Sequence, residues 1–584
     1  MSEVDREGYW QRMAGQRIER RRALRFAALG SAGLATLALA CGSKGGPSGQ
    51  ASSQPTSTNT GNAVGGGQAK TGGHLRHILP YSAGNIDPHT TEDYVGYGFV
   101  EGYWYEPVIS LDYGDGTVDW RIAMKVIPSL AEKIEQPDQS TAILTIRQDV
   151  KWHDGNPLTA ADVIFSYKRM MTPDPSITAA IKGYTSHLSA VEAVDDRTVR
   201  VTAKTPDADF LVYLAQRNTA IVSAKALQGG QSLSKQAVGT GPFRLSSYTK
   251  DGSAEATRFE SYWQKGRPYL DGIKMTLHAD DATMGAAFAA GQTDIITRTD
   301  KAQAEPLLKA NPKARFRRFL EDQIQGLTFN ETKPPFNDLR VRQAIHLAMD
   351  RQEANKAVTF DEGQISGPVV VVGKTGWFIP TDELLKLPGY RQPKDQDIAQ
   401  AKQLLAAAGY PNGFKTTLAY KPAEAVTPQD SEVVQSQLKK IGVNVDLVGL
   451  DNAAYVSHRA KGDYDILMIV EGSMSLPANV LNTTFYSKSI YGKPAGINDS
   501  ELDQLIDSQV TEFDFAKRGQ IYQQIERRIL DQVHKAPIST PSVYVLQQPW
   551  IYAWVDNRSS RQTVMNPATI WMDTNLARQS GQQV

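Results

Sequence analysis

An uncharged apolar run at residues 26–40, which ends directly at Cys41, constrains this chain more than any other sequence feature. Fifteen residues span roughly 22 Å as a helix, which is less than the ~30 Å hydrocarbon core of a membrane. The run follows the basic stretch RIERRRALR and closes with small residues, as a secretory signal does. We therefore predict that residues 1–41 direct export and take no part in the folded core.

The end of this run resembles a bacterial lipobox, in which the cysteine thiol is lipidated and becomes the new N-terminus. Cys41 is the single cysteine of the chain, and Ala40 is the small residue expected before it, whereas Ala38 stands where leucine is commonest. The stretch RRALR also resembles a twin-arginine export signal, with Arg20 in place of the usual serine or threonine. Cys41 is therefore the predicted lipidation site; the alternative is a cysteine buried in an ordinary hydrophobic helix.

Residues 42–71 form a second distinctive segment, rich in glycine, serine and other polar residues and without any aromatic residue. Such a composition buries too little apolar surface to fold. As a flexible tether of about 30 residues it would reach on the order of 30 Å. The sequence thus predicts an exported protein with a lipid anchor, a tether and a folded body that begins near residue 72. Its place would be the outer face of the cell membrane or the periplasm.

The composition of the whole chain narrows the classes of function. Lys+Arg and Asp+Glu number 63 each, so no net charge attracts the protein to nucleic acid or to an anionic membrane surface. One cysteine excludes an internal disulfide and a multi-cysteine zinc site, and neither HExxH nor GxSxG occurs. His74 and His77 are three apart in a segment expected to be extended, which puts them on opposite faces. We expect no catalytic set, no metal site and no cofactor.

Hydrophobic periodicity predicts the coarse secondary structure of the body. Alternation at Ala142, Leu144 and Ile146 predicts a strand, and Thr159 with Asp162 predicts a capping box at the start of a helix. Apolar positions at helical spacing predict further helices at residues 341–348, 398–408, 434–441 and 521–529. Alternating helices and strands favour an α/β arrangement in the second half, and the first half is richer in strands.

Seven stretches of the body also carry a family resemblance. In chain order they are VIPSLAEKIEQPDQSTAILTIRQDVKWHDGNPLTAADVIFSYKRM, GTGPFRLSSYTKDGSAEATRFESYWQKGRPYLDGI, LTFNETKPPFNDLRVRQAIHLAMDR, AKQLLAAAGYPNGF, LKKIGVNVDL, GDYDIL and ELDQLIDSQVTEFDFAKRGQIYQQIERRIL. Together they resemble the peptide/nickel class (family 5) of bacterial extracellular solute-binding proteins, the receptors of ABC importers. The resemblance runs from about residue 72 to about residue 555.

The resemblance implies an α/β, two-lobed periplasmic-binding-protein-like fold of the class II type. Its first lobe would be enlarged, and its mixed sheets would be flanked by helices. Residues 72–327 would form lobe I, residues 328–542 lobe II, and residues 543–584 a return to lobe I with a C-terminal tail. IQGLTFN and APISTPSVYVL would be the two segments that cross between the lobes.

The function implied is that of a lipid-anchored receptor that binds peptides, or another medium-sized solute, in a cleft between the lobes. It would deliver this ligand to the transmembrane subunits of an ABC permease, and we expect a monomer. Closure of two lobes around a solute buries it without altering a covalent bond. One alternative is an oligosaccharide receptor of the same fold. An alternative of another class is a tethered secreted hydrolase.

The candidate ligand-binding residues also follow from the resemblance. Peptide receptors of the family hold the ligand α-amine with an aspartate in a Trp-Gly-x-Asp-Tyr-x-Asp-Pro-like stretch. The matching stretch here is IVEGSMSLPANVL, in which Pro477 matches, Ser473 falls at the aspartate position and Val470 at the tryptophan. Glu471 could supply a carboxylate from a nearby position, or the ligand is not a peptide. A histidine is absent from this stretch, which disfavours nickel.

Aromatic side chains complete the set of candidates, because aromatic faces suit both sugar rings and apolar side chains. For each of them, packing in a core is the alternative. The candidates are Tyr94, Tyr97, Tyr103, Trp104 and Tyr105 in lobe I, and Trp377 and Phe378 in lobe II.

Overall fold

The computed structural model describes the body of the chain. The described residues are 68–79, 85–90, 102–112, 125–230, 232–234, 236–250, 252–277, 280–321, 323–369, 376–422, 427–472, 477–552, 557–559, 562–564 and 567–582. Cys41, the predicted tether up to residue 67, Tyr94, Tyr97 and Ser473 lie outside them. Among the described residues, no helix combines the length and the apolar character needed to cross a membrane.

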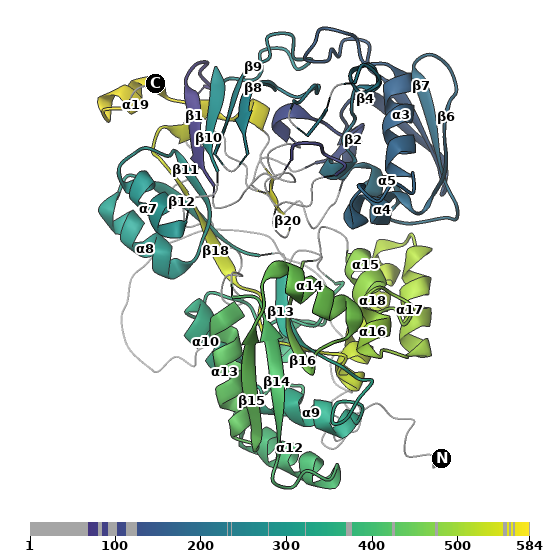
Figure 1. Cartoon of the computed structure of the whole chain (residues 1–584), viewed down its shortest axis with the longest axis vertical. Coiled ribbons are helices and arrows are strands. Elements are labelled where there is room, and N and C mark those ends of the chain that lie inside the picture. The colour runs from purple at the N-terminus through teal and green to yellow at the C-terminus, as the bar shows by residue number, and fades with distance from the viewer. Residues whose placement is uncertain are drawn as a thin grey trace, which may run out of the picture.

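Two groups of elements are separate in Figure 1, and each has its own sheets and core clusters. We call the upper group lobe I and the lower group lobe II. The main sheet of lobe I has the strand order β12-β18-β11-β1-β10-β9-β8, with β1 parallel to both of its neighbours and the other pairs antiparallel. Its strands are β1 (His74–Ile78), β8 (Phe243–Thr249), β9 (Ser253–Arg258), β10 (Gly272–Thr276), β11 (Ile295–Thr299), β12 (Arg315–Leu320) and β18 (Ser542–Gln547).

A second, antiparallel sheet of lobe I has the order β4-β5-β7-β6 and forms a core with the helices that pack on it. The capping box predicted at Thr159 and Asp162 is confirmed, since each side chain bonds the backbone of the other residue. The elements are β4 (Ala131–Asp138), β5 (Thr141–Ile146), β6 (Leu188–Ala193), β7 (Thr198–Ala203), α3 (Ala160–Met170), α4 (Ala179–Thr185), α5 (Phe210–Leu214) and α6 (Ala224–Gln228). Helices α7 (Asp281–Ala289) and α8 (Lys301–Ala310) pack on the main sheet instead.

Lobe II is built on one mixed sheet of order β15-β14-β16-β13-β17. Its strands are β13 (Gln323–Phe329), β14 (Phe414–Tyr420), β15 (Val443–Gly449), β16 (Ile466–Gly472) and β17 (Lys535–Pro537). Its helices are α9 (Leu339–Ala348), α10 (Arg351–Thr359), α11 (Thr381–Leu384), α12 (Asp395–Ala407), α13 (Thr427–Lys439), α14 (Asn452–Lys461), α15 (Pro477–Val480), α16 (Gly492–Ala495), α17 (Ser500–Val510) and α18 (Phe515–Gln532). The four helices predicted from periodicity are confirmed as α9, α12, α13 and α18.

The remaining elements are short, and the last described residues lie on lobe I. They are β2 (Ile109–Leu111), β3 (Val126–Pro128), β19 (Ile551–Tyr552), β20 (Asn557–Ser559), β21 (Gln562–Val564), β22 (Trp571–Met572), α19 (Thr574–Gln579), the 3₁₀ turns Arg217–Thr219 and Pro567–Thr569, and the π-helical turn Leu481–Phe485. Lys70 pairs with Asp573 at 2.7 Å, and Arg76 on β1 donates to Gln582 at 2.8 Å. The C-terminal segment therefore packs beside β1, close to the residue where the predicted tether joins the body.

Candidate functional site

The junction between the lobes consists of two segments that run side by side. The chain passes from β12 to β13 over residues 320–323, and returns from β17 to β18 over residues 537–542. The backbone N–H of Gln325 donates to Ser539 at 3.0 Å, and that of Ile538 donates back to Gln325 at 2.7 Å. Paired strands at a lobe boundary are the elements about which two lobes can rotate. Strand β13 begins at Gln323, so the sheet of lobe II starts slightly before the border predicted at residues 327 and 328.

Three buried polar side-chain atoms of this junction have no hydrogen-bond partner among the described residues. They are Nε2 of Gln323, Oε1 of Gln325 and Oγ of Ser539, and each residue is 2% exposed or less. Leaving such a group unpaired costs roughly 1–3 kcal/mol, so a buried polar atom normally has a partner. Sequence reasoning missed these residues. The available signal was the pair of glutamines at alternate positions of the mostly apolar, fully buried strand QIQGLTF.

Glu471, the predicted carboxylate, is the next-to-last residue of β16, on the lobe II side of this junction, and is buried. Its carboxylate accepts hydrogen bonds from Lys535 Nζ at 3.1 Å, from Thr484 Oγ1 at 2.6 Å and from the guanidinium of Arg459. Burial alone would raise the pKa of Glu471, but Lys535 and Arg459 outweigh it and hold that pKa below its ordinary value. The carboxylate is therefore charged and already bound by two cations, and a ligand amine would have to displace one of them.

The lobe I aromatic candidates within the described residues lie in a core. Tyr103, Trp104 and Tyr105 are 2% exposed or less and belong to one cluster beneath the main sheet. Gly239 lies directly against this segment, because a Cβ at that position would be 1.7 Å from the Trp104 carbonyl oxygen. The structure thus gives these three side chains a packing role, and their contact with a ligand stays a prediction.

The lobe II aromatic candidates lie beside α18. Trp377 is buried, stacks on Tyr522 with 4.7 Å between ring centroids, and donates from Nε1 to the Phe515 carbonyl at 3.1 Å. Phe378 is half-buried against the same cluster. Gly519 makes room for the indole, since a Cβ there would be 2.8 Å from Trp377 Cδ1. A role for either side chain in ligand binding also stays a prediction.

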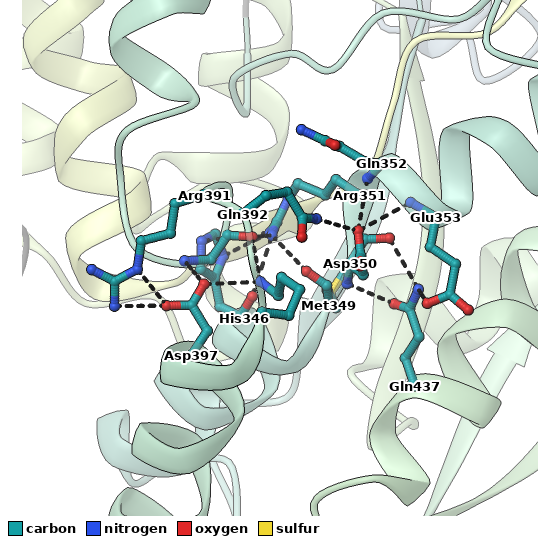
Figure 2. Close-up of polar contacts among 12 residues, drawn as sticks. His346, Met349, Asp350, Arg351, Gln352, Glu353, Arg391, Gln392, Asp397 and Gln437 are labelled. Carbon is teal, nitrogen blue, oxygen red and sulfur yellow. Dashed lines mark hydrogen bonds and ion pairs between the residues drawn. The ribbon is translucent and has the colours of Figure 1, made fainter.

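A buried arginine fixes the returning segment to lobe II, as Figure 2 shows for its contacts at the junction of α9 and α10. Arg351 donates from Nε to the Pro537 carbonyl of β17 at 2.7 Å, and from Nη1 to the carbonyls of His346 at 3.3 Å and Gly389. Its guanidinium also lies 4.1 Å from the centroid of the Tyr390 ring. One side chain therefore joins β17, the end of α9 and the 389–390 turn, which fixes the crossing segment to the body of lobe II.

Glu362 of lobe II contacts lobe I near the crossing segments and provides a second fixed point there. It follows α10 and accepts from Tyr544 Oη on β18 at 2.6 Å and from Lys301 Nζ on α8 at 3.0 Å. Phe360 and Asp361, directly before it, both have positive φ angles of 55° and 61°, a region that non-glycine residues seldom adopt. This unusual turn directs the Glu362 carboxylate from lobe II onto lobe I.

Nothing in the described residues forms a metal centre: no group of three or more His, Cys, Asp or Glu side chains there is placed to hold an ion. The junction instead combines crossing strands, buried polar atoms and ion pairs. Such an arrangement can hold a solute through hydrogen bonds and can change the angle between two lobes.

Comparisons with known proteins agree with this architecture. Heme-binding protein A of Haemophilus influenzae is 29% identical over 458 residues, which cover 74% of this chain and 82% of the relative. Di/tripeptide-binding protein 1 of Pseudomonas aeruginosa is 26% identical over 448 residues, covering 72% of this chain and 81% of the relative. The solved structure of the binding protein AgaA of A. tumefaciens R10, in complex with agropinic acid, superposes with a TM-score of 0.70 at 26% identity. That match covers 86% of this chain and 99% of AgaA.

The family comparison carries the assignment. The sequence model of bacterial extracellular solute-binding proteins, family 5 (middle region), matches residues 125–493, which is more than half of the chain. The predicted α/β periplasmic-binding-protein fold is confirmed. The structure has mixed sheets flanked by helices in two lobes, and it superposes on a solved binding protein. The protein therefore belongs to family 5 of the bacterial extracellular solute-binding proteins, a family that binds solutes and is not enzymatic.

Proposed function

We propose that this protein is the lipid-anchored receptor of an ABC importer. It binds a peptide, or a solute of similar size, between its lobes and delivers it to the permease. The observation that carries the proposal is a set of buried polar atoms on the segments that join the lobes. These atoms of Gln323, Gln325 and Ser539 have no hydrogen-bond partner within the described part of the chain. Relatives named for heme and for di- and tripeptides support a solute of this size range.

The chemistry of the junction supports ligands that exchange hydrogen bonds. A glutamine Nε2 donates and a glutamine Oε1 accepts, which suits peptide groups and also sugar hydroxyls. Tyr94, Tyr97 and Ser473 stay proposed ligand contacts on the grounds of the family resemblance and their side-chain chemistry. A lipid on Cys41 and the tether predicted for residues 42–71 would keep the receptor close to its permease.

An oligosaccharide remains the alternative ligand, and one observation favours it. The Glu471 carboxylate is bound by Lys535 and Arg459, so it is not free to receive the α-ammonium group of a peptide. A ligand without such a group would need no rearrangement of this ion cluster. An uncharged sugar oligomer meets that condition.

A thermal-shift screen separates these ligand classes. Di- and tripeptides, glutathione, hemin, and cello- and xylo-oligosaccharides would each be added to the purified protein. A ligand present at 100 times its dissociation constant adds about 2.7 kcal/mol to the free energy of unfolding, which raises the melting temperature visibly. Stabilisation by peptides supports the first form of the proposal, and stabilisation by sugar oligomers alone supports the second. No response to any class would count against the receptor function.

Two matched variants then test whether the junction holds the ligand. Gln325→Met should abolish the ligand-induced shift but should not lower the ligand-free melting temperature, because Oε1 of Gln325 has no partner among the described residues. Gln437→Met is the control, since its Nε2 donates to the Asp350 carbonyl at 3.0 Å inside lobe II. It should lower the ligand-free melting temperature and preserve the shift. Equal ligand shifts in both variants would show that the ligand binds elsewhere.

The anchor has its own test. In a bacterial host that processes lipoproteins, the wild-type protein should fractionate with membranes. Mass spectrometry should then find a processed protein that begins at Cys41 and carries a lipid on that residue. Cys41→Ser should release the protein into the soluble exported fraction with its fold intact. A wild-type protein cleaved without lipid would contradict the anchor while leaving the receptor function open.

A further inference from the structure

Away from the crossing segments, the lobes make a second contact through a buried ion pair. Arg518, on α18 of lobe II, donates from Nη1 to Oδ1 of Asp209 at 2.8 Å and from Nη2 to the other carboxylate oxygen. Asp209 directly precedes α5 of lobe I, and the two side chains are only 6% and 5% exposed. The backbone N–H of Ala208 also donates to the Val510 carbonyl at 2.8 Å. This contact thus joins two chain segments that share no core cluster.

Residues of lobe II hold the guanidinium of Arg518 in the orientation that the ion pair with Asp209 requires. Gln509 accepts from Arg518 Nη2 at 2.7 Å and from Nε at 3.2 Å, and Tyr522 Oη donates to the same Gln509 oxygen at 3.1 Å. The centroid of the Trp377 ring lies 5.2 Å from the guanidinium carbon of Arg518. A guanidinium fixed in this way loses little side-chain entropy when it meets a carboxylate, so the pair gains more on closure than two mobile side chains would.

The Asp209 carboxylate is likewise directed at lobe II rather than at its own helix. It occupies the N-cap position of α5, yet within the described chain it makes no capping hydrogen bond to that helix. The backbone N–H of Asp209 is held by Asp207 Oδ1 at 2.8 Å, which fixes the turn before α5. Lobe I therefore presents this carboxylate across the boundary at no cost to helix capping.

The Arg518–Asp209 pair lies away from the crossing segments, so its presence restricts the angle between the lobes. In Figure 1, α5 of lobe I and α18 of lobe II both lie on the right of the molecule, whereas β13 and β18, which flank the crossing segments, lie further left. Rotation of the lobes about the crossing segments would separate Arg518 from Asp209 while leaving the hinge contacts in place.

We propose that Arg518 and Asp209 form a latch that holds the two lobes together in the absence of ligand. A latch of this kind raises the fraction of empty receptors that are already closed. The apparent affinity for a ligand depends on that fraction, so the latch would set affinity without touching the ligand. The inference concerns the ligand-free protein and holds whichever solute is bound.

The distance between the lobes can be measured by pulsed electron paramagnetic resonance. Spin labels would be attached to Glu192→Cys on β6 and Gln504→Cys on α17, two exposed positions in lobe I and lobe II. Cys41 is the only native cysteine, so a Cys41→Ser background makes both labels unique. Without ligand, the protein with an intact latch should give a single short distance.

Asp209→Asn and Arg518→Gln should each add a longer distance and shift the ratio of closed to open molecules about tenfold or more, because close charge pairs across interfaces are strongly coupled. The matched control is Arg528→Gln. Arg528 lies on the same helix, but its partner Asp499, at 2.7 Å, belongs to lobe II, so the inter-lobe distance should not change. A protein with an intact latch that already shows the long distance, or latch variants that keep the short one, would overturn the proposal.

Disulfide cross-linking tests the contact between the lobes in a second way, which does not depend only on substitutions of the buried charges. The Ala208 and Val510 backbones are hydrogen-bonded across the boundary, so Ala208→Cys with Val510→Cys reports contact between the lobes through disulfide formation. In ligand-free protein this disulfide should form readily, and adding Asp209→Asn should slow its formation about tenfold. Equal rates with and without Asp209→Asn would contradict the latch, and faster formation would do so more strongly.

Discussion

Lys535 reaches across strand β13 to Glu471, with 3.1 Å between Nζ and Oε2. The two residues lie on β17 and β16, the strands that flank β13, and Gly326 lies between them. A Cβ at residue 326 would be 3.1 Å from Lys535 Cε and 2.9 Å from the Ala536 carbonyl oxygen. The missing side chain therefore lets one ion pair tie three strands together beside the crossing segments.

Glu471→Gln should destabilise the ligand-free protein strongly. The substitution leaves the buried ammonium of Lys535 without its carboxylate, and removing one partner of a buried pair costs about 3–5 kcal/mol. Urea unfolding without ligand measures the loss. Glu501→Gln is the control, because Glu501 is 66% exposed in its pair with Arg528 and should cost less than about 1 kcal/mol. If Glu471→Gln unfolds like the wild type but loses ligand, the carboxylate serves the ligand instead of the sheet.

Gly326→Ala should also destabilise lobe II, by about 1–3 kcal/mol, because the added methyl group meets the backbone of β17 rather than a flexible side chain. Circular dichroism melts of the two proteins would measure it. The matched substitution Gly285→Ala lies within α7, where the new Cβ would be 3.7 Å from Leu307 Cδ2, an ordinary contact. Since alanine favours helix, Gly285→Ala should be neutral or slightly stabilising. A similar loss in both variants would disprove the steric argument.

Local elements were predictable from the sequence because their determinants are local. The capping box of α3 depends on residues three apart, and the apolar face of α18 repeats at Ile521, Ile525 and Ile529. The family resemblance then supplied the two-lobed arrangement, which no local pattern contains.

The contacts at the junction could not be predicted in the same way. Lys535 is 64 residues from Glu471, and Arg518 is 309 residues from Asp209, so no spacing in the sequence connects them. The aromatic segment at residues 103–105 shows the other limit. The composition of this segment suits a binding surface and a core equally well. Its place in the core depends on close packing against the backbone of Gly239, which is distant in the sequence.

Arg351→Lys should weaken the connection between lobe II and its crossing segment. A lysine ammonium cannot reproduce the planar fork that now serves Pro537 and Gly389 from different nitrogens, so at least one carbonyl loses its donor, at roughly 1–3 kcal/mol each. Chemical denaturation should show this loss. Lys440→Gln is the control, since its ion pair with Glu353 at 3.2 Å joins side chains that are 49% and 52% exposed. The control should lose less unfolding free energy than Arg351→Lys, because the Arg351 guanidinium is buried and serves several carbonyls. Equal losses in the two variants would contradict the role of Arg351.

Asp430 makes the stability of lobe II depend on pH. It lies in the first turns of α13, fully buried, and neither carboxylate oxygen has a hydrogen-bond partner among the described residues. Burial raises the pKa of Asp430 from 3.8 to about 8. The folded protein then holds this proton more tightly than the unfolded chain does. The free energy of unfolding should therefore fall as pH rises from 3.8 towards about 8.

Asp430→Asn should remove that dependence, because an amide matches the protonated acid in shape and charge but does not titrate. Relative to the wild type, the variant should gain roughly 1.4 kcal/mol in unfolding free energy for each pH unit between about pH 5 and pH 8. Urea unfolding at several pH values measures the difference. Glu432→Gln, at an exposed position of the same helix, should show no such trend. An unpaired buried acid makes the unfolding free energies of wild type and Asp430→Asn diverge with pH. Parallel pH profiles would therefore contradict this prediction and would mean that the carboxyl group has a partner or contacts water.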